Sequence, residues 1–187
     1  MNVNNWGPGG WIFLHSMAAN YPNNPTDFDK QRYSQFFNSV GNMLPCRYCR
    51  ESYKTYMKYL PIESFLNDRE GVHYWLYRLH NLINDKIFKQ TTSFRNVVST
   101  YENIRATCGK KQRDDDYQKN YNTCQTQNGN LQDAYILDFV NSAEQKYKQL
   151  VDDMVNNLYS SSDNPNKDYL EYQKKNGIQM SYNIDYL

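Results

Sequence analysis

The stretch that decides the fold lies at residues 67–87 and reads NDREGVHYWLYRLHNLINDKI. Its apolar side chains recur every three or four residues, which is the period of one helical face. Asn67 or Asp68 can cap this helix, because a short polar side chain accepts hydrogen bonds from the first free N–H groups. The sequence therefore predicts a long helix whose apolar face carries Val72, Trp75, Leu79, Leu82, Ile83 and Ile87.

Helical patterns of the same kind lie on both sides of this stretch. No segment shows the alternation of apolar and polar residues that is typical of a strand. The sequence therefore predicts an all-α fold. The helix signals are Pro22 after the first helix, Thr26 and Asp29 as a capping box for the second, Pro45 and Pro61 around the third, and Thr92 or Ser93 before the fifth.

The chain changes character after the fifth predicted helix. Residues 109–130 carry clustered Lys, Arg and Asp followed by Asn and Gln, which is typical of a solvated loop. We place a boundary there, so that residues 1–107 form one domain and residues 108–187 form a C-terminal extension. In the extension, polar residues 160–187 are expected to be only partly ordered. A helical seam with four-three spacing precedes them and consists of Ile136, Val140, Ala143, Tyr147, Leu150 and Met154.

The composition argues against several classes of protein. The 187 residues carry a net charge of +1, which gives no electrostatic case for binding nucleic acid or an anionic membrane surface. No apolar run is long enough to span a membrane, and the first residues lack the pattern of a secretory signal. We therefore expect a soluble cytoplasmic protein, in which four cysteines indicate redox or metal chemistry before structural bridges.

Two of the cysteines stand in the sequence Cys46-Arg47-Tyr48-Cys49. If Pro45 opens a helix, Cys46 lies where free N–H groups and the helix dipole favour a thiolate. The two intervening residues let the sulfurs meet within one turn, so the pair can cycle between dithiol and disulfide. Half of a zinc site and an inert pair are the alternatives, although zinc would need two more ligands at suitable spacing.

A second group of residues combines aromatic rings, amides and cations. These are the groups that a planar polycyclic ligand with phosphates requires, because it needs aromatic walls, fixed polar contacts and positive charge. For each histidine in the group, and for His73 outside it, an ordinary core or surface role is the alternative. The members are Trp11 and His15 on the first helix and Trp75, His80, Asn81, Asn84, Lys86 and Lys89 on or just after the fourth.

Three motifs carry a resemblance to a known family. They are WGPGGWIFLH at residues 6–15, followed by AANYP, then PCRYCR at residues 45–50, and WLYRLHNLIN at residues 75–84. In their order and spacing they resemble the Erv/ALR family of FAD-dependent sulfhydryl oxidases, most closely the members from large DNA viruses. The resemblance covers about residues 5–102 and implies a bundle of four helices with a short fifth, which holds FAD non-covalently near the cysteine pair.

The resemblance also implies a reaction. Cys46 and Cys49 would be the catalytic pair, reduced by the thiols of a substrate protein or of a thioredoxin-like relay. The electrons would then pass to FAD and on to molecular oxygen, which yields hydrogen peroxide. A homodimer formed through the first two helices is expected, in the cytoplasm or, for a viral member, the host cytoplasm or virion. The FAD contacts implied are Gly7, Trp11, His15, Tyr21, Cys49, Tyr77, His80, Asn81, Asn84, Lys86, Lys89 and Tyr101.

Two features depart from the family pattern. Phe94 stands where the family often has a cysteine of a structural disulfide, and the five residues before Trp6 contain no cysteine of a shuttle pair. Cys108 and Cys124 can therefore form a structural disulfide, act as the shuttle, or remain unpaired. For the whole chain, the other hypotheses are a zinc-stabilised helical interaction module and a catalytically silent scaffold.

Overall fold

The computed structural model describes residues 3–106 and 133–176, and in these ranges it consists of helices without any strand. This confirms the all-α prediction for the described part of the chain. The elements are α1 (Val3–Ala19), α2 (Asp27–Met43), α3 (Arg47–Tyr59), the short 3-10 helix η1 (Ile62–Phe65), α4 (Arg69–Lys86), α5 (Phe94–Ala106), α7 (Asp133–Ser160) and α8 (Lys167–Asn176).

Short polar side chains begin several helices, as the sequence predicts. Thr26 and Asp29 form the reciprocal hydrogen bonds of the capping box at the start of α2. Asp68, rather than Asn67, caps α4 by accepting a hydrogen bond from the N–H of Gly71 at 2.7 Å. These caps fix where each helix begins, because they satisfy N–H groups that have no partner within the helix.

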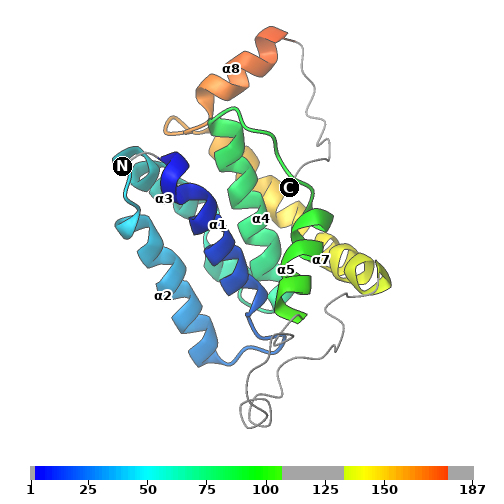
Figure 1. The fold of residues 1–187 in the computed structure, drawn as a ribbon. Coiled ribbons are helices and arrows are strands. Elements are labelled where there is room, and N and C mark those ends of the chain that lie inside the picture. Colours follow the sequence, from blue (N-terminus) through cyan, green and yellow to red (C-terminus); the bar gives the residue numbers. More distant parts are fainter. Residues whose placement is uncertain (1–2, 107–132, 177–187) are drawn as a thin grey trace.

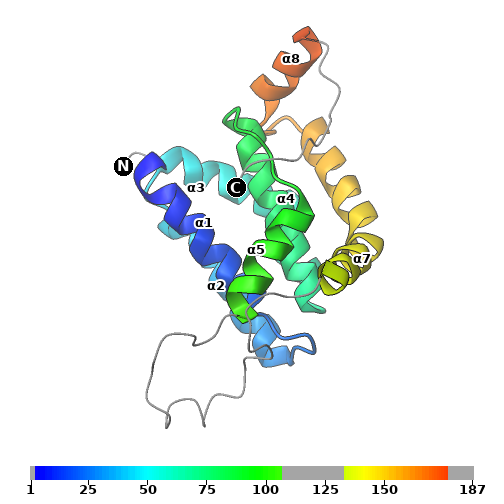
Figure 2. The same ribbon diagram turned by 45° about the vertical axis from the view of Figure 1, so that its right-hand side comes forward.

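The helices form the predicted bundle with one additional layer. In the bundle α1 packs against α4 and α2 packs against α3, and the shorter α5 packs against α1 and α4 (Figure 1). The long helix α7 crosses the side of α4 and α5 that faces away from α2 (Figure 2). As a result α4 is enclosed by neighbours, and every residue from Gly71 to Leu79 is buried. None of the described helices is long and apolar enough to cross a membrane.

The centre of the core is aromatic, and its polar atoms have partners. Trp75 is completely buried, packs edge to face on Phe37 at a centroid distance of 4.9 Å, and donates its indole N–H to the carbonyl of Leu60 at 2.9 Å. Tyr53 is also buried and donates its hydroxyl to the carbonyl of Phe37 at 2.8 Å. Hydroxyl groups enter this core without a large penalty because each of these donors is satisfied.

The seam of α7 is buried as predicted in its first half and then shifts by one position. Leu150, a predicted seam residue, is 37 % exposed, whereas its neighbour Val151 is completely buried. The prediction for Leu150 is therefore wrong. A strict four-three repeat drifts around a straight helix with 3.6 residues per turn, so the buried face moves to the next residue. The buried face of α7 consists of Ile136, Phe139, Val140, Ala143, Tyr147, Val151, Val155 and Leu158.

The part of the extension after residue 160 that the structure describes contains the helix α8. Asn166, just before α8, is 1 % exposed and donates to the carbonyl of Leu82 at 2.8 Å. It also accepts the hydroxyl of Tyr56 at 2.5 Å, so one amide joins α8 to both α3 and α4. The predicted boundary at residue 108 and the residues Cys108 and Cys124 lie outside the described residues.

Candidate active site

The cysteine pair lies at the start of α3 as a disulfide. Cys46 and Cys49 are bonded through their sulfurs, with their Cα atoms 5.1 Å apart. The Sγ of Cys46 also accepts a hydrogen bond from the backbone N–H of Cys49 at 3.2 Å. Both residues are partly exposed, so a thiol from outside can reach the pair. This arrangement confirms that the two sulfurs meet within one turn.

The position of Pro45 differs from the prediction, and the difference favours the redox role of Cys46. The helix begins at Arg47 and not at Pro45, so Cys46 is its N-cap, with extended φ and ψ angles of −106° and 124°. An N-cap side chain faces the free N–H groups of the first turn and the positive end of the helix dipole. After reduction, both would stabilise a thiolate on Cys46.

The two arginines beside the pair bind other groups. Arg47 forms an exposed ion pair with Glu51 at 3.0 Å. Arg50 donates to the backbone carbonyl of Leu44 at 2.5 Å and so ties the segment before the disulfide to α3. The helix start, rather than either guanidinium, is therefore the electrostatic feature in contact with Cys46.

Four of the predicted ligand residues meet in one place, and we call them the aromatic cluster: Trp11, His15, His80 and Tyr101. Trp11 of α1 stacks on His80 of α4 with a centroid distance of 3.7 Å and an interplanar angle of 12°. His15 stacks on Tyr101 of α5 at 4.7 Å and 17°. The Nε2 of His15 lies 3.1 Å from the Nδ1 of His80, so one ring donates to the other. The flat side chains of α1, α4 and α5 thus pack against one another in one cluster.

Both histidines of the cluster are held neutral. Burial, and then the neighbouring His80 and His73, keep the pKa of His15 well below the ordinary value of 6.5. Burial and the charge of Lys89 lower the pKa of His80 to about 4. The Nδ1 of His15 and the Nε1 of Trp6 are buried and have no hydrogen-bond partner among the described residues. Such atoms fit a polar ligand bound against the cluster, because a buried polar group without a partner is costly.

The predicted polar contacts have different surroundings. The amide of Asn81 donates to the carbonyl of Thr92 at 2.9 Å and accepts the N–H of Thr92 at 3.2 Å, so it fixes the turn before α5. Lys86 donates to the hydroxyl of Ser52, one turn after Cys49, and burial lowers the pKa of this lysine. This contact brings the end of α4 close to the disulfide. Asn84 is buried nearby, and Lys89 is exposed.

The remaining predicted contacts pack against other residues. Tyr21 is fully buried and donates to the carbonyl of Leu66 at 2.8 Å, which ties the turn after α1 to the start of α4. Tyr77 packs on Phe94 at 5.1 Å. Gly7 is buried, and a Cβ there would lie 3.3 Å from the side chain of Val3. The structure gives Tyr21 and Tyr77 a packing role, and their contact with FAD stays a prediction.

The comparisons with known proteins match the region that holds these sites. The model of the Erv1 / Alr family matches residues 8–102, which include the disulfide and the aromatic cluster. The chain belongs to the Erv1/Alr family. The elements α7 and α8 lie after the matched segment and are additions to the family domain in this chain.

Several relatives of this Erv1/Alr chain are named sulfhydryl oxidases. The probable FAD-linked sulfhydryl oxidase of Acanthamoeba polyphaga mimivirus is 36% identical over 103 residues, or 54% of this chain and 72% of the relative. An African swine fever virus FAD-linked sulfhydryl oxidase is 30% identical over 97 residues, 52% of this chain and 80% of the relative. The mitochondrial enzyme ERV1 of Saccharomyces cerevisiae is 33% identical, with 47% of this chain matching 46% of the relative.

Solved structures agree with the sequence comparison. The crystal structure of the FAD binding domain of Erv1 from Saccharomyces cerevisiae superimposes with a TM-score of 0.52 and 29% sequence identity. The overlap covers 55% of this chain and 95% of that domain. The predicted family fold is therefore confirmed, and the part of the chain outside the overlap contains the additional helices.

The sequence did not reveal two features around the site. The contact between Ser52 and Lys86 joins α3 to α4, and only the register of two distant helices could have indicated it. His73, for which we expected a core or surface role, is completely buried in a charged network with Glu102. In the sequence, only the acidic residue Glu102 next to Tyr101 pointed to this network. The sequence could not show its partners, because they come from three helices.

Proposed function

We propose that this chain is a FAD-dependent sulfhydryl oxidase that forms disulfides in protein thiols and reduces oxygen to hydrogen peroxide. The observation that carries this proposal is the Cys46–Cys49 disulfide at the start of α3, within the segment matched by the Erv1/Alr family. Relatives named FAD-linked sulfhydryl oxidases support the cofactor and the reaction class.

The first half of the reaction is thiol–disulfide exchange. A substrate thiolate attacks the Sγ of Cys46, which forms a mixed disulfide and releases Cys49 as a thiolate. A second substrate thiolate attacks the substrate sulfur of the mixed disulfide, releases Cys46 as a thiolate and leaves the substrate as a disulfide. The N–H of Cys49, 3.2 Å from the Sγ of Cys46, stabilises this leaving group. Two electrons then reside on the Cys46–Cys49 dithiol.

The residues that would hold FAD are members of the aromatic cluster and the lysines at the end of α4. The flat faces of Trp11 and Tyr101 offer stacking surfaces, and the Nδ1 of His15 offers a polar contact without a competing partner among the described residues. Lys86 and Lys89 supply positive charge at the end of α4 for phosphate groups. When bound, FAD supplies a two-electron acceptor for the dithiol and a donor to oxygen. Since Trp11 and His80 are in van der Waals contact, a ring inserted between them would require Trp11 to turn.

Three further statements about the protein are part of this proposal. A homodimer through α1 and α2 is supported by the exposed side chains of Ile12, Phe13 and Phe28, which are 56 %, 55 % and 59 % exposed. Substrates are protein thiols or a thioredoxin-like relay. We place the protein in the cytoplasm, or in the host cytoplasm or virion for a viral member.

A zinc module is less well supported than an oxidase. Zinc binds cysteine thiolates, whereas Cys46 and Cys49 are joined to each other. Among the described residues, no group of three or more His, Cys, Asp or Glu side chains is arranged to hold a metal ion. Cys108 and Cys124 lie outside the described residues, and a structural disulfide, a shuttle pair or unpaired thiols stay the predictions for them.

The experiment that tests the proposal measures oxygen uptake with a dithiol substrate after the purified protein is saturated with FAD. Wild-type protein is expected to consume oxygen and release one hydrogen peroxide per disulfide formed. Cys46→Ser and Cys49→Ser are each expected to abolish dithiol-dependent uptake while the protein still binds FAD. Thr55→Ala, which loses a hydrogen bond to the carbonyl of Glu51 within α3, is the nearby control that keeps both sulfurs. Equal uptake by wild type and Cys49→Ser would rule out the cysteine pair as the electron entry.

A further inference from the structure

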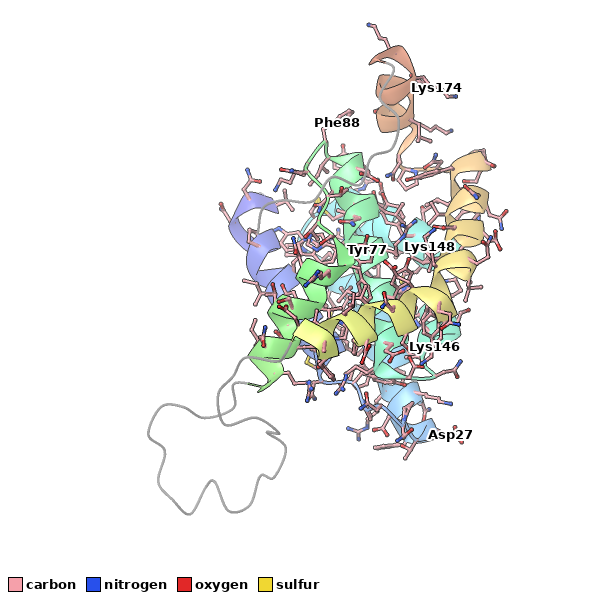
Figure 3. The ribbon with its side chains drawn as sticks, turned by 90° about the vertical axis from the view of Figure 1, so that its right-hand side faces the viewer. Asp27, Tyr77, Phe88, Lys146, Lys148 and Lys174 are labelled. Atoms are coloured by element: carbon pink, nitrogen blue, oxygen red, sulfur yellow. A yellow bond between two sulfur atoms is a disulfide. The ribbon has the colours of Figure 1, made fainter. Side chains whose placement is uncertain are left out.

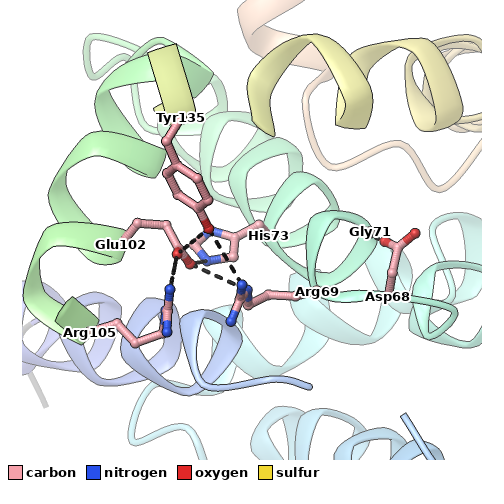
Figure 4. A network of polar contacts seen from close by, with 7 residues as sticks. All are labelled: Asp68, Arg69, Gly71, His73, Glu102, Arg105 and Tyr135. Carbon is pink, nitrogen blue, oxygen red and sulfur yellow. Dashed lines mark hydrogen bonds and ion pairs between the residues drawn. The ribbon is translucent and has the colours of Figure 1, made fainter. Parts of the chain in front are cut away.

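A buried charged network joins α4, α5 and α7 (Figure 4). Its centre is the carboxylate of Glu102, which is completely buried. Arg105 donates to the Oε2 of Glu102 at 2.7 Å, and Tyr135 donates its hydroxyl to the same oxygen at 3.1 Å. The Nε atom of Arg69 forms an ion pair with the Oε1 at 3.5 Å, and the Nε2 of His73 lies 3.3 Å from the same oxygen, in both cases without an aligned hydrogen bond.

The charges in this network depend on one another. Burial alone would raise the pKa of Glu102, but His73, Arg105 and Arg69 outweigh it and hold that pKa at about 2. Burial lowers the pKa of His73 and keeps it neutral, although Glu102 acts in the opposite direction. Removing one member of a buried charged group leaves the others without compensation and is strongly destabilising. The geometry of Glu102 is therefore tightly specified.

The network is connected to the aromatic cluster along α5. Tyr101, whose ring stacks on His15 at 4.7 Å, directly precedes Glu102 in the sequence. The two side chains leave α5 about 100° apart, so one contacts α1 and the other contacts α4 and α7.

Only the second half of α5 depends on Glu102. The first half is already fixed by the bonds between Asn81 and Thr92 and by Phe94, which is 3 % exposed and packs edge to face on Tyr74. Tyr101 lies two turns further along the helix. Val97 and Val98, which are 2 % and 0 % exposed, fix the middle of α5, and the contacts of Glu102 fix the following turn, in which Tyr101 lies.

We propose that Glu102 is a positioning residue that holds Tyr101 against His15 and so shapes the FAD site. Tyr135 of the C-terminal extension takes part by donating its hydroxyl to the carboxylate of Glu102. The inference rests on the proposed function, since it concerns the site at which FAD would bind. Tyr135 and α7 lie beyond the segment that matches the family, so this chain's extension supports the cofactor site of the family domain.

The test compares Tyr135→Phe and Glu102→Gln with Asp152→Asn in the full-length chain. Asp152 of α7 forms an ion pair with Arg78 of α4 at 3.1 Å, so its variant weakens the same helix contact without touching Glu102. For each variant, the FAD dissociation constant, the near-ultraviolet circular dichroism of the bound flavin and the melting temperature are measured. The first two report the shape of the site, and the third reports general stability.

We expect FAD to dissociate about three- to tenfold more readily from Tyr135→Phe and Glu102→Gln, with a changed flavin dichroism, because a hydrogen bond to a buried charge is lost or weakened. Asp152→Asn is expected to lower the melting temperature while the affinity and the dichroism stay as in wild type. If Glu102→Gln does not fold, the comparison between Tyr135→Phe and Asp152→Asn decides.

Two results overturn the inference. In one, Tyr135→Phe binds FAD with unchanged affinity and dichroism; in the other, Asp152→Asn alters both as strongly as Tyr135→Phe does, which would show only a general effect of α7. Wild-type protein that binds no FAD at all would instead contradict the proposed function, so the two failures are distinguishable.

Discussion

Replacing Gly71 by alanine tests whether α7 is packed on the family domain as the structure describes. A Cβ at Gly71 would overlap the backbone carbonyl oxygen of Phe65 and lie 2.8 Å from the Cζ of Tyr147 in α7. Real Cβ atoms do not approach other atoms so closely, and the carbonyl oxygen belongs to the backbone and cannot turn away. The methyl group therefore forces α4, η1 and α7 apart.

The expected loss of stability follows from two opposing contributions. Overpacking of a filled core costs about 1–3 kcal/mol. The upper end of this range, about 3 kcal/mol, applies at Gly71 because the obstacle is a backbone carbonyl oxygen. Alanine in a helix gains about 1 kcal/mol over glycine. We therefore expect a net loss of about 2 kcal/mol, which lowers the melting temperature of a chain of this length by about 4–8 °C.

The assay is thermal unfolding followed by circular dichroism at one fixed FAD concentration, because bound ligand raises the melting temperature. Gly9→Ala is the matched control. Gly9 also lies inside a helix, α1, but a Cβ there has nothing within 4 Å. This variant is expected to gain about 0.5–1 kcal/mol.

Repeating the Gly71→Ala substitution in a Tyr147→Ala chain separates the clash with the carbonyl of Phe65 from the clash with the ring of Tyr147. In a Tyr147→Ala chain one obstacle is already absent, so adding Gly71→Ala should cost less than it does in the wild type. If Gly71→Ala is as stable as Gly9→Ala, or if its cost is the same with and without Tyr147, the described packing of α7 on α4 is refuted.

Three other expectations concern pH, backbone strain and a buried amide. The pKa of His80 is about 4 in the folded protein and 6.5 in the reference state, so its contribution to stability is complete above pH 6.5 and is lost as the pH falls toward 4. Urea unfolding of His80→Gln should therefore show a weaker pH dependence in this window, and an unchanged dependence contradicts the low pKa. Phe88, at the turn after α4 (Figure 3), has a φ of 55°, a conformation that costs an ordinary residue about 1–2 kcal/mol. Since asparagine tolerates it better, Phe88→Asn should raise the melting temperature, and a decrease would show that ring contacts outweigh strain. Asn166→Ala deprives the hydroxyl of Tyr56 and the carbonyl of Leu82 of a partner and should lower the unfolding free energy by about 1–3 kcal/mol in calorimetry, whereas a neutral effect would contradict the attachment of α8.

Local signals in the sequence were sufficient for most of the bundle. The capping box of Thr26 and Asp29, the cap at Asp68 and the period of the apolar face depend only on neighbouring residues, so they predict helix positions directly. The cysteine pair could also be predicted, because two residues between the sulfurs fix their separation. Only the family resemblance could predict that Trp11 and His80 belong to one site, because sequence spacing does not show which helices pack together.

Most of the features that escaped prediction depend on distant partners. The burial of Val151 instead of Leu150 follows from how a straight helix crosses α4, and the capping of α3 by Cys46 follows from the turn before it. The role of Glu102 was equally hidden, because its partners come from three helices. A charged residue in a polar sequence is usually on the surface, and only the fold reveals that this one is buried.

The central claim is that electrons from a thiol pass through the Cys46–Cys49 pair to a bound flavin. The most direct measurement is an anaerobic titration of FAD-loaded protein with a dithiol, followed through the visible absorption band of the flavin. Wild-type protein is predicted to lose this band as one equivalent of dithiol beyond the cysteine pair is added, while Cys49→Ser retains it. A band that persists in the wild type, or that bleaches equally in Cys49→Ser, would contradict the account.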